Sequence, residues 1–349
     1  MKNLKFNKLQ LITVNLFLAT FVYTGIACNA QPTPGRSLLA LSKTDRKLAI
    51  VDPVTLKVIA RIPVGDDPHE VIASSDGKTA YVTIYGGGSL HELDVLDLVA
   101  QKPIVSFDTR PLFGPHGLTF VNGKAWFTAE GSKSIGSYDP ATGKLDWSMG
   151  TGQDRTHMIY VSADGKKIYT TNVSSGTVSI LEAVTVQPGR FGPPNGRPHE
   201  EWTQTIVPVS RGSEGFDVSP DGKELWTAAS EDGNISIIDL SAKKLDTKID
   251  AKVNGANRLK FTPDGKKVFI SSLQSGELTI YDAKSRKEIK RLKIGHGAAG
   301  ILMDPDGSRA FVACSADNYI AVIDLKTLEV TTHFDVGGVP DGLAWAVQP

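Results

Sequence analysis

A short phrase recurs along this chain about every 43 residues. It consists of a D-G-K or N-G-K turn, an apolar strand, a second turn and a strand ending in an I-D-L-like triplet. A fixed period in this range is typical of repeat architectures, and Asp-Gly or Asn-Gly between apolar runs is a strong hairpin signal. The sequence therefore predicts a repeat of β-hairpins. The turns are Asp76-Gly77, Asn122-Gly123, Asp164-Gly165, Asp221-Gly222, Asp264-Gly265 and Asp306-Gly307, spaced by 46, 42, 57, 43 and 42 residues.

Each repeat contains four predicted strands. In the fifth repeat they are Leu259–Thr262, Lys267–Ser271, Glu277–Asp282 and Ile289–Ile294. These runs are rich in β-branched and aromatic residues and are separated by Gly, Ser, Asn and Asp. Helical periodicity is absent beyond the first thirty residues. Four-stranded antiparallel units at this period are the blades of a β-propeller, so the predicted fold class is all-β.

Counting the repeats predicts seven blades, with one blade divided between distant parts of the chain. Ser37 to Gly65 would supply three strands of the divided blade, and Asp341 to Ala346 its innermost strand. Joining them closes the ring and leaves no free radial sheet edge. We therefore expect deletion of the last ten residues to abolish cooperative unfolding. The six undivided repeats begin near Asp67, Pro111, Arg155, Gly212, Asn254 and His296.

Residues 1–30 are predicted to be an export signal, followed by a single domain over 31–349. Lys2 to Lys8 form a basic region, and the apolar stretch from Leu11 to Tyr23 is too short and too interrupted for a membrane span. Cleavage after residue 30 would release a soluble protein, whereas cleavage before Cys28 would leave a lipidated cysteine. The aliphatic residue usual three positions before such a cysteine is here Gly25. Either route predicts a periplasmic or secreted domain. Any lipid anchor would be attached to Cys28.

Charge and cysteine content exclude several functions. Without the three lysines of the export signal the net charge is −3, and no basic face is available to follow phosphates, so we expect no nucleic-acid partner. Cys314 is the only cysteine of the domain, which excludes an internal disulfide. Its place within a strand predicts that it is a small buried packing residue. The sequence favours a monomer.

The strand motifs resemble those of the seven-bladed YVTN-repeat propellers. The resemblance rests on Tyr81-Val82-Thr83-Ile84 and Tyr169-Thr170-Thr171-Asn172, on the S-x-D-G-K turn at Ser219 to Lys223, and on Ile238-Asp239-Leu240. It covers nearly all of residues 37 to 347. It implies the fold and an extracytoplasmic location. The related propellers include proteins of unknown role, lactonases and haem-carrying reductase domains, so the resemblance leaves the function open.

The predicted site lies at the mouth of the central channel. Propeller ligands usually bind among the loops that lead into the innermost strands, and aligning the blades there gives one residue per blade. Three of the seven histidines of the chain fall at this same position in consecutive blades. The aligned residues are His69, His116, His157, Glu214, Asn257, Ala299 and Asp341.

Two ligand classes follow from this set. His69, His116 and His157 could hold a divalent metal, since zinc, copper and nickel accept imidazole. Arg155 and Arg258, which lie beside the ring, could bind a carboxylate or phosphate. The alternative interpretation is that a water-filled channel simply has polar residues at its rim and that the arginines form ordinary loop ion pairs. Arg110 and Arg211 lie at similar places, whereas His91, His199, His296 and His333 fall outside the ring.

A Pro/Gly-rich insertion at residues 187–201 explains the longest gap between repeats. It separates the third and fourth strands of the third blade and carries Arg190, Phe191 and Arg197. Such connections lie on the face opposite the channel mouth. Long loops of this kind are often functional, so both partner docking and a tolerated surface excursion remain open.

The sequence favours an exported, non-enzymatic binding scaffold over an enzyme. It has no nucleophile motif, no dinucleotide fingerprint and no C-x-x-C-H haem-attachment motif. Its expected ligand is a small anionic molecule or an envelope protein. The alternative is a lactonase-like hydrolase or lyase, with the histidines or a metal polarising a carbonyl and Glu214 as general base. A weaker hypothesis is a redox partner that resembles the haem-binding propellers.

Overall fold

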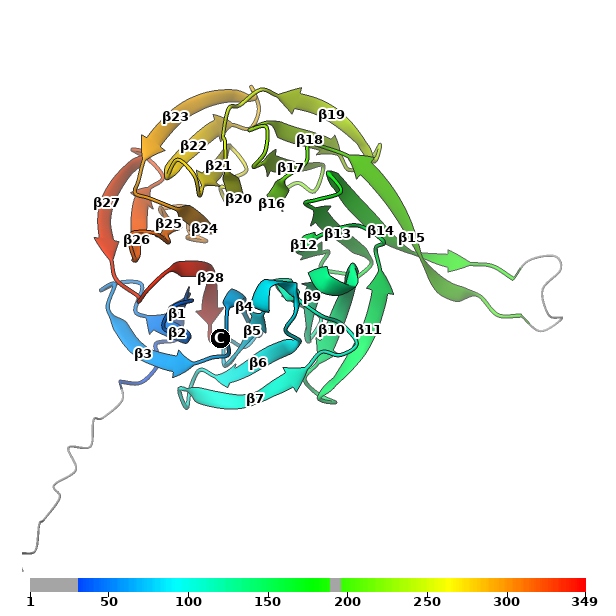
Figure 1. The fold of residues 1–349 in the computed structure, drawn as a ribbon, viewed down its shortest axis with the longest axis horizontal. Coiled ribbons are helices and arrows are strands. Elements are labelled where there is room, and N and C mark those ends of the chain that lie inside the picture. Colours follow the sequence, from blue (N-terminus) through cyan, green and yellow to red (C-terminus); the bar gives the residue numbers. More distant parts are fainter. Residues whose placement is uncertain (1–30, 189–195) are drawn as a thin grey trace, which may run out of the picture. The chain divides into compact units, whose positions relative to one another are not determined.

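The computed structural model describes residues 31–188 and 196–349 and confirms the predicted fold class. Seven blades of four antiparallel strands surround a central channel (Figure 1). The only helical elements among the described residues are two single 3₁₀ turns, η1 (Gly86–Gly88) and η2 (Glu130–Ser132). No helix in the described part of the chain has the length and apolar character needed to cross a bilayer. The predicted export signal, with Cys28, lies outside the described residues.

The strands of each blade run from the channel outwards in chain order, except in the divided blade. Blade 1 contains β4 (Pro68–Ala73), β5 (Thr79–Ile84), β6 (Glu92–Asp97) and β7 (Lys102–Asp108). Blade 2 contains β8 (Pro115–Val121), β9 (Lys124–Ala129), β10 (Ser134–Asp139) and β11 (Lys144–Gly150). Blade 3 contains β12 (Thr156–Val161), β13 (Lys167–Asn172), β14 (Thr177–Val186) and β15 (His199–Pro208). Blade 4 contains β16 (Ser213–Val218), β17 (Glu224–Ala229), β18 (Ile235–Asp239) and β19 (Lys244–Ile249). Blade 5 contains β20 (Ala256–Phe261), β21 (Lys267–Ser272), β22 (Glu277–Asp282) and β23 (Lys287–Lys293). Blade 6 contains β24 (Ala298–Met303), β25 (Arg309–Cys314), β26 (Tyr319–Asp324) and β27 (Glu329–Phe334). Blade 7 contains β28 (Pro340–Val347), β1 (Arg36–Ser42), β2 (Lys47–Val51) and β3 (Val58–Pro63), in that order from the channel.

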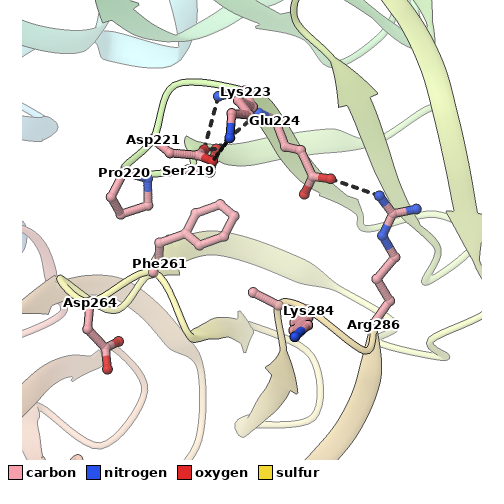
Figure 2. Close-up of a pocket in the computed structure, with 11 residues that line it drawn as sticks. Ser219, Pro220, Asp221, Lys223, Glu224, Phe261, Asp264, Lys284 and Arg286 are labelled. Carbon is pink, nitrogen blue, oxygen red and sulfur yellow. Dashed lines mark hydrogen bonds and ion pairs between the residues drawn. The ribbon is translucent and has the colours of Figure 1, made fainter.

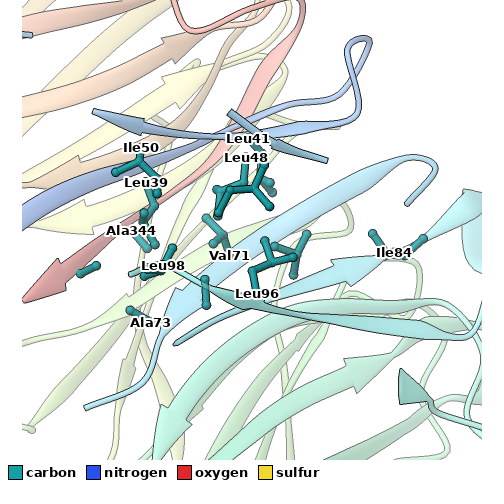
Figure 3. Close-up of a cluster of buried hydrophobic side chains, with 14 residues drawn as sticks. Leu39, Leu41, Leu48, Ile50, Val71, Ala73, Ile84, Leu96, Leu98 and Ala344 are labelled. Atoms are coloured by element: carbon teal, nitrogen blue, oxygen red, sulfur yellow. The ribbon is translucent and has the colours of Figure 1, made fainter. Parts of the chain in front are cut away.

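Blade 7 closes the ring as predicted. Its innermost strand β28 pairs antiparallel with β1, with Leu39 opposite Ala344. Leu39, Leu41 and Ile50 of this blade pack against Val71 and other apolar residues of blade 1 (Figure 3). Because a sheet edge is exposed wherever a blade is incomplete, this pairing is what joins the two ends of the propeller.

The apolar core is divided among the blade interfaces. Seven clusters of buried side chains lie in the described residues, each between two neighbouring blades. Alternation along the strands explains this arrangement, because successive side chains point to opposite faces of a blade and both faces are covered by a neighbour. Each blade is therefore stabilised by the two blades that flank it.

The repeated D-G turns connect the first and second strands of the blades. In blade 1 the Ser74 hydroxyl donates to Asp76 Oδ1 over 2.6 Å, and the Lys78 amide donates to the same carboxylate over 3.1 Å. Gly77 has a φ of 65°, which L-residues with a side chain rarely adopt. In blade 2, Asn122 and Gly123 both have positive φ and form a two-residue hairpin turn.

The insertion forms a hairpin arm rather than a loop over its whole predicted length. β14 and β15 are ten residues long and pair as far as Val186 opposite His199, so the arm extends beyond the ring (Figure 1). His199, Glu200 and Glu201, which the sequence placed in the loop, therefore belong to a strand. Residues 189–195, which include Arg190 and Phe191, lie outside the described residues.

Every innermost strand carries a β-bulge near its start. In blade 1 the register shifts between Pro68 and Val71, so His69 and Glu70 face no regular partner on β5. The Thr83 hydroxyl replaces the missing ladder bonds. It accepts from the Glu70 amide over 3.1 Å and donates to the His116 carbonyl of blade 2 over 2.8 Å.

The same hydroxyl bridge recurs between other blades. Thr128 connects the Gly117 amide to the His157 carbonyl, with distances of 2.8 and 2.5 Å. Thr171 and Ser271 hold the carbonyls of the next ring residues in the same way, over 2.6 Å in each case. The threonine of the Y-V-T-x motif therefore fixes the backbone of the innermost strands relative to one another.

Candidate functional site

The aligned ring residues occupy the second position of each innermost strand and surround the channel mouth. A cavity of about 280 Å³ lies there. All eight residues predicted to bind a ligand line this cavity. They are His69, His116, Arg155, His157, Glu214, Asn257, Arg258 and Asp341.

The residue before each innermost strand has a left-handed backbone conformation. It is a glycine in four blades, whereas Asp67, Arg155 and Val339 adopt φ values of 53°, 53° and 52° without being glycine. The carbonyl of each of these residues accepts a hydrogen bond from the first residue after the second strand of its own blade. This repeated turn orients the following ring residue toward the channel.

The three histidines form a row along one side of the mouth. The ring centroids of His69 and His116 are 4.6 Å apart, and those of His116 and His157 are 3.9 Å apart. The Tyr85 ring contacts the edges of both His69 and His116 at centroid distances of 4.8 and 5.0 Å. His116 and His157 are only 2% and 3% exposed. Two of the three imidazoles are therefore buried beneath the cavity.

Glu130 is a site residue that the sequence analysis missed. Its carboxylate contacts His157 Nδ1 and accepts a 2.5 Å hydrogen bond from the Tyr85 hydroxyl. Hydrogen bonding to His157 lowers the pKa of Glu130 although burial opposes ionisation. Burial and the Glu130 carboxylate raise the pKa of Tyr85, which keeps its proton for this bond. One potential ligand atom from each of His116, Glu130 and His157 lies within 4.8 Å of the others, which is spacing suitable for a metal ion.

One sequence alignment could have found Glu130 and Tyr85. Both immediately follow the second strand of their blades, and in every blade this position lies on the same face as the start of the innermost strand. Aligning it yields a second ring. Its members are Tyr85, Glu130, Val173, Ser230, Leu273, Ser315 and Lys43.

His69 makes contacts that differ from those of the other two histidines. Its Nε2 lies 2.6 Å from Lys43 Nζ and 3.1 Å from Asp67 Oδ1, and its Nδ1 lies 3.6 Å from Asp341 Oδ2. The hydrogen bond from His69, with Lys43 nearby, lowers the pKa of Asp67. His69 thus belongs to an ion-pair cluster at the rim, whereas His116 and His157 belong to the group with Glu130.

Arg258, which lines the cavity, forms an ion pair with Glu70. The Arg258 guanidinium contacts the Glu70 carboxylate and lies 4.0 Å from Asp341 Oδ1, and its side chain is 7% exposed. The carboxylates of Glu70, Asp341 and Glu214 raise the pKa of Arg258 against the opposing effect of burial. Asn257 donates to Glu214 over 2.8 Å beside this pair.

The remaining arginines and histidines lie elsewhere. Arg110 pairs with Asp108, and Arg211 lies 3.9 Å from Glu231; neither arginine lines the cavity. The four histidines expected outside the ring are also absent from the cavity lining. Cys314 is fully buried, as expected.

A larger cavity of about 470 Å³ lies between the D-G turns of blades 4 and 5 (Figure 2). Two ion pairs lie at this cavity: Arg286 pairs with Glu224 over 2.8 Å, and Lys223 pairs with Asp221 over 3.1 Å. Lysine, arginine, aspartate and glutamate thus all contribute to its lining.

Residues 195–308 match the model of the cytochrome D1 heme domain family. This match covers less than half of the chain. No curated protein matches the sequence.

Many solved structures share the fold. A functionally unknown protein from Desulfotomaculum acetoxidans is 13% identical with a TM-score of 0.71, covering 90% of this chain and 99% of that protein. A proposed 6-phosphogluconolactonase from Bacteroides fragilis is 16% identical with a TM-score of 0.70, covering 89% and 97%. A dihydro-heme d1 dehydrogenase is 16% identical with a TM-score of 0.60, covering 88% of this chain and 64% of that chain. At these identities the likeness concerns the fold, and it places the chain among the β-propeller proteins.

Proposed function

We propose that this protein is an exported, non-enzymatic β-propeller that binds a small anionic molecule at its channel mouth. The observation that carries the proposal is the guanidinium of Arg155. Its side chain is 44% exposed and lies 3.6 Å from Glu130 Oε2 and 3.8 Å from Glu214 Oε1. Within the described residues this guanidinium donates no hydrogen bond to a side chain or backbone atom. Its N–H groups are therefore available to a carboxylate or phosphate through two parallel hydrogen bonds, in competition with the looser ion pairs to Glu130 and Glu214.

The surrounding residues limit the kind of ligand. The cavity volume of about 280 Å³ favours a molecule smaller than most drug-sized ligands. Glu214 and Asp341 also line the cavity and would repel a polyanion, whereas hydroxyl groups of a ligand could donate to them. We therefore propose a small carboxylate or phosphate monoester that also carries hydroxyl groups.

Binding to a panel of such compounds tests the proposal. Sugar acids, dicarboxylates and phosphate monoesters would be titrated into the mature protein by calorimetry and thermal shift. Arg155→Gly is the informative variant, because glycine occupies the equivalent left-handed position in four blades and the backbone should stay unchanged. We expect this variant to lose binding and Arg155→Lys to retain only part of it.

Arg211→Ala is the matched control, since it removes a rim arginine that does not line the cavity. It should bind like the unaltered protein. A ligand that binds Arg155→Gly and the unaltered protein equally would contradict the proposal. A ligand whose binding requires the hairpin arm instead would favour an envelope protein as partner.

Export and membership of the YVTN-repeat group belong to the same proposal. The resemblance is supported by the bridging role of Thr83 and Thr171, which explains why the motif has a hydroxyl at that position. Mass spectrometry of the mature protein tests the export route. A free amino terminus at Gln31 would indicate a soluble exported protein, and a lipid on Cys28 would indicate an anchored one. A protein retained in the cytoplasm with residues 1–30 intact would contradict export.

The residues at the mouth do not fit a buried haem. A tetrapyrrole is larger than a drug-sized ligand, whereas the cavity is smaller than the usual drug-sized pocket. The nitrogens His116 Nδ1 and His157 Nε2 are enclosed by neighbouring atoms rather than presented on an open face. We therefore assign no role to haem d1 in this chain.

Lactone hydrolysis is the second candidate function. The neighbours described as proposed 6-phosphogluconolactonases act, by that name, on an anionic lactone, a ligand class that Arg155 could bind. Glu214 would then serve as general base, held by its hydrogen bond from Asn257. Turnover of a phosphorylated sugar lactone by the unaltered protein but not by Glu214→Gln would favour this candidate over a scaffold.

A further inference from the structure

We propose that His116 and His157 bind one transition-metal ion, Zn²⁺ or Cu²⁺, beneath the channel-mouth cavity, with Glu130 as a positioning residue. This inference deepens the proposed function. It rests on that function only because the ion would lie at the same cavity.

Two buried imidazole nitrogens without partners are the first observation. Within the described residues His116 Nδ1 and His157 Nε2 have no hydrogen-bond partner, although both atoms are shielded from solvent. Leaving a buried polar atom unsatisfied is unfavourable, so two such atoms on neighbouring imidazoles call for an explanation. A shared metal ion would satisfy both.

The second observation is how Glu130 orients His157. The carboxylate contacts Nδ1 and can accept its proton, and in the neutral ring of that tautomer Nε2 has a lone pair. Metal-binding histidines almost always donate their other ring N–H to a carboxylate or carbonyl in this manner. The other oxygen of Glu130 is held by the Tyr85 hydroxyl over 2.5 Å, so the carboxylate itself is fixed.

The backbone also holds the two histidines in place. The His116 carbonyl accepts from Thr83, and the His157 carbonyl accepts from Thr128, so both ring residues are anchored to the preceding blade. These bonds fix the backbone of both residues, and the two ring centroids lie 3.9 Å apart. A backbone fixed in advance reduces the entropic cost of binding, and the rings need only turn about their side-chain bonds to share an ion.

The donor set selects the ion. Imidazole suits zinc and copper, whereas Mg²⁺ and Ca²⁺ require oxygen ligands. Both oxygens of Glu130 already contact His157 and Tyr85. Both histidines line the cavity, so water or the anionic ligand could supply the further ligands that such an ion needs.

Metal titration of the purified, tag-free protein tests the proposal. After chelator treatment, Zn²⁺, Cu²⁺ and Mg²⁺ would be titrated separately by calorimetry, with bound metal measured by elemental analysis. We expect about one Zn²⁺ or Cu²⁺ per chain and no Mg²⁺ binding. His116→Gln and His157→Gln should each lose the ion. Glu130→Gln should weaken metal binding by about 10- to 100-fold, because it alters the group that accepts the other ring N–H of a metal-binding histidine.

His333→Gln is the matched control, because it removes an exposed histidine of β27 far from the cavity lining. It should bind the ion normally. Circular dichroism would establish that each variant folds, and the thermal shift on adding Zn²⁺ gives a second readout for variants of low solubility. Equal binding by the unaltered protein and the two histidine variants would overturn the proposal, as would no binding by the unaltered protein.

The experiment also separates this inference from the proposed function. Arg155→Gly should retain the ion while losing the anionic ligand. If the unaltered protein binds the metal but no anion, the proposed function is wrong and the metal site stands. If it binds an anion but no metal, the metal site is wrong and the proposed function stands.

Discussion

Glu70 of blade 1 and Arg258 of blade 5 form an ion pair inside the channel, with side chains 12% and 7% exposed. Arg258 lines the channel-mouth cavity, and both residues line a second cavity of about 360 Å³. The pair joins innermost strands that are three blades apart in the ring.

Glu70→Ala should lower the free energy of unfolding by about 3–5 kcal/mol, because it leaves the buried Arg258 guanidinium without its counter-ion. Replacing both residues, as in Glu70→Leu with Arg258→Met, should restore much of the loss. Urea unfolding followed by tryptophan fluorescence measures both variants. Arg110→Ala, which breaks an exposed pair with Asp108, is the control and should change stability little. If Glu70→Ala and Arg110→Ala lower the free energy of unfolding equally, the buried pair in the channel stabilises the protein no more than an exposed pair does.

Gly117→Ala should perturb the metal site through the backbone. A Cβ at this position would lie 2.7 Å from Met158 Cα and closer still to the His157 carbonyl oxygen. Such overpacking costs about 1–3 kcal/mol, and here it would displace His157. We expect lower stability together with weaker Zn²⁺ binding. Gly150→Ala, where the added Cβ would have only a Ser134 atom at 3.9 Å, should alter neither property.

Thr83→Val tests the hydroxyl bridge between the first two blades. The substitution keeps the shape of the side chain but leaves the Glu70 amide and the His116 carbonyl without a partner. The expected loss of stability is about 1–3 kcal/mol, measured by chemical denaturation. Thr332→Val, on an exposed position of β27, provides the comparison. If both valine variants unfold at the same denaturant concentration, the bridge contributes nothing to stability.

Deleting residues 340–349 removes β28 and with it the innermost strand of blade 7. We expect the truncated protein to lose its single cooperative thermal transition, because β1 would then expose an unpaired edge. Differential scanning calorimetry gives the measurement. Removing only Gln348 and Pro349, which lie beyond β28, should leave the transition in place. A truncated protein that melts like the full chain would mean that the ring does not need this closure.

Cys314 should resist alkylation in the folded protein. Burial raises the pKa of its thiol to about 12, so the nucleophilic thiolate is scarce at pH 8. In the unfolded chain the thiol ionises near its ordinary pKa. Its contribution to stability is therefore complete below about pH 9 and declines as the pH rises toward 12. Iodoacetamide labelling in a Cys28→Ser background, with and without urea, checks the first point. Rapid labelling of the native protein would contradict it.

The repeat explains why the fold and the ring were predictable. Asp76-Gly77 and its equivalents mark the same hairpin in successive blades, so alignment alone placed His69, His116 and His157 at one structural position. Glu130 was missed because the equivalent position carries tyrosine, valine, leucine, lysine or serine in the other blades, so no motif repeats there. Alignment of the residue after each second strand would have found it.

Partner assignments within the site could not be predicted from the repeat. His69, His116 and His157 occupy equivalent positions, yet Lys43 of blade 7 engages the first and Glu130 of blade 2 engages the third. These partners come from loops of other strands, and their choice depends on side-chain reach rather than on spacing along the chain. The predicted three-histidine metal set therefore remains a hypothesis, beside the pair inferred above.

Ring closure by β28 sets the time at which the channel mouth can form during biogenesis. This strand is the last of the twenty-eight in the described residues, and it contributes Asp341 to the cavity. A nascent polypeptide would hence carry the histidines well before it possessed a finished pocket. A small molecule that contacts Asp341 would be captured after the last blade is assembled, and its occupancy would reflect the supply in the compartment where folding is completed.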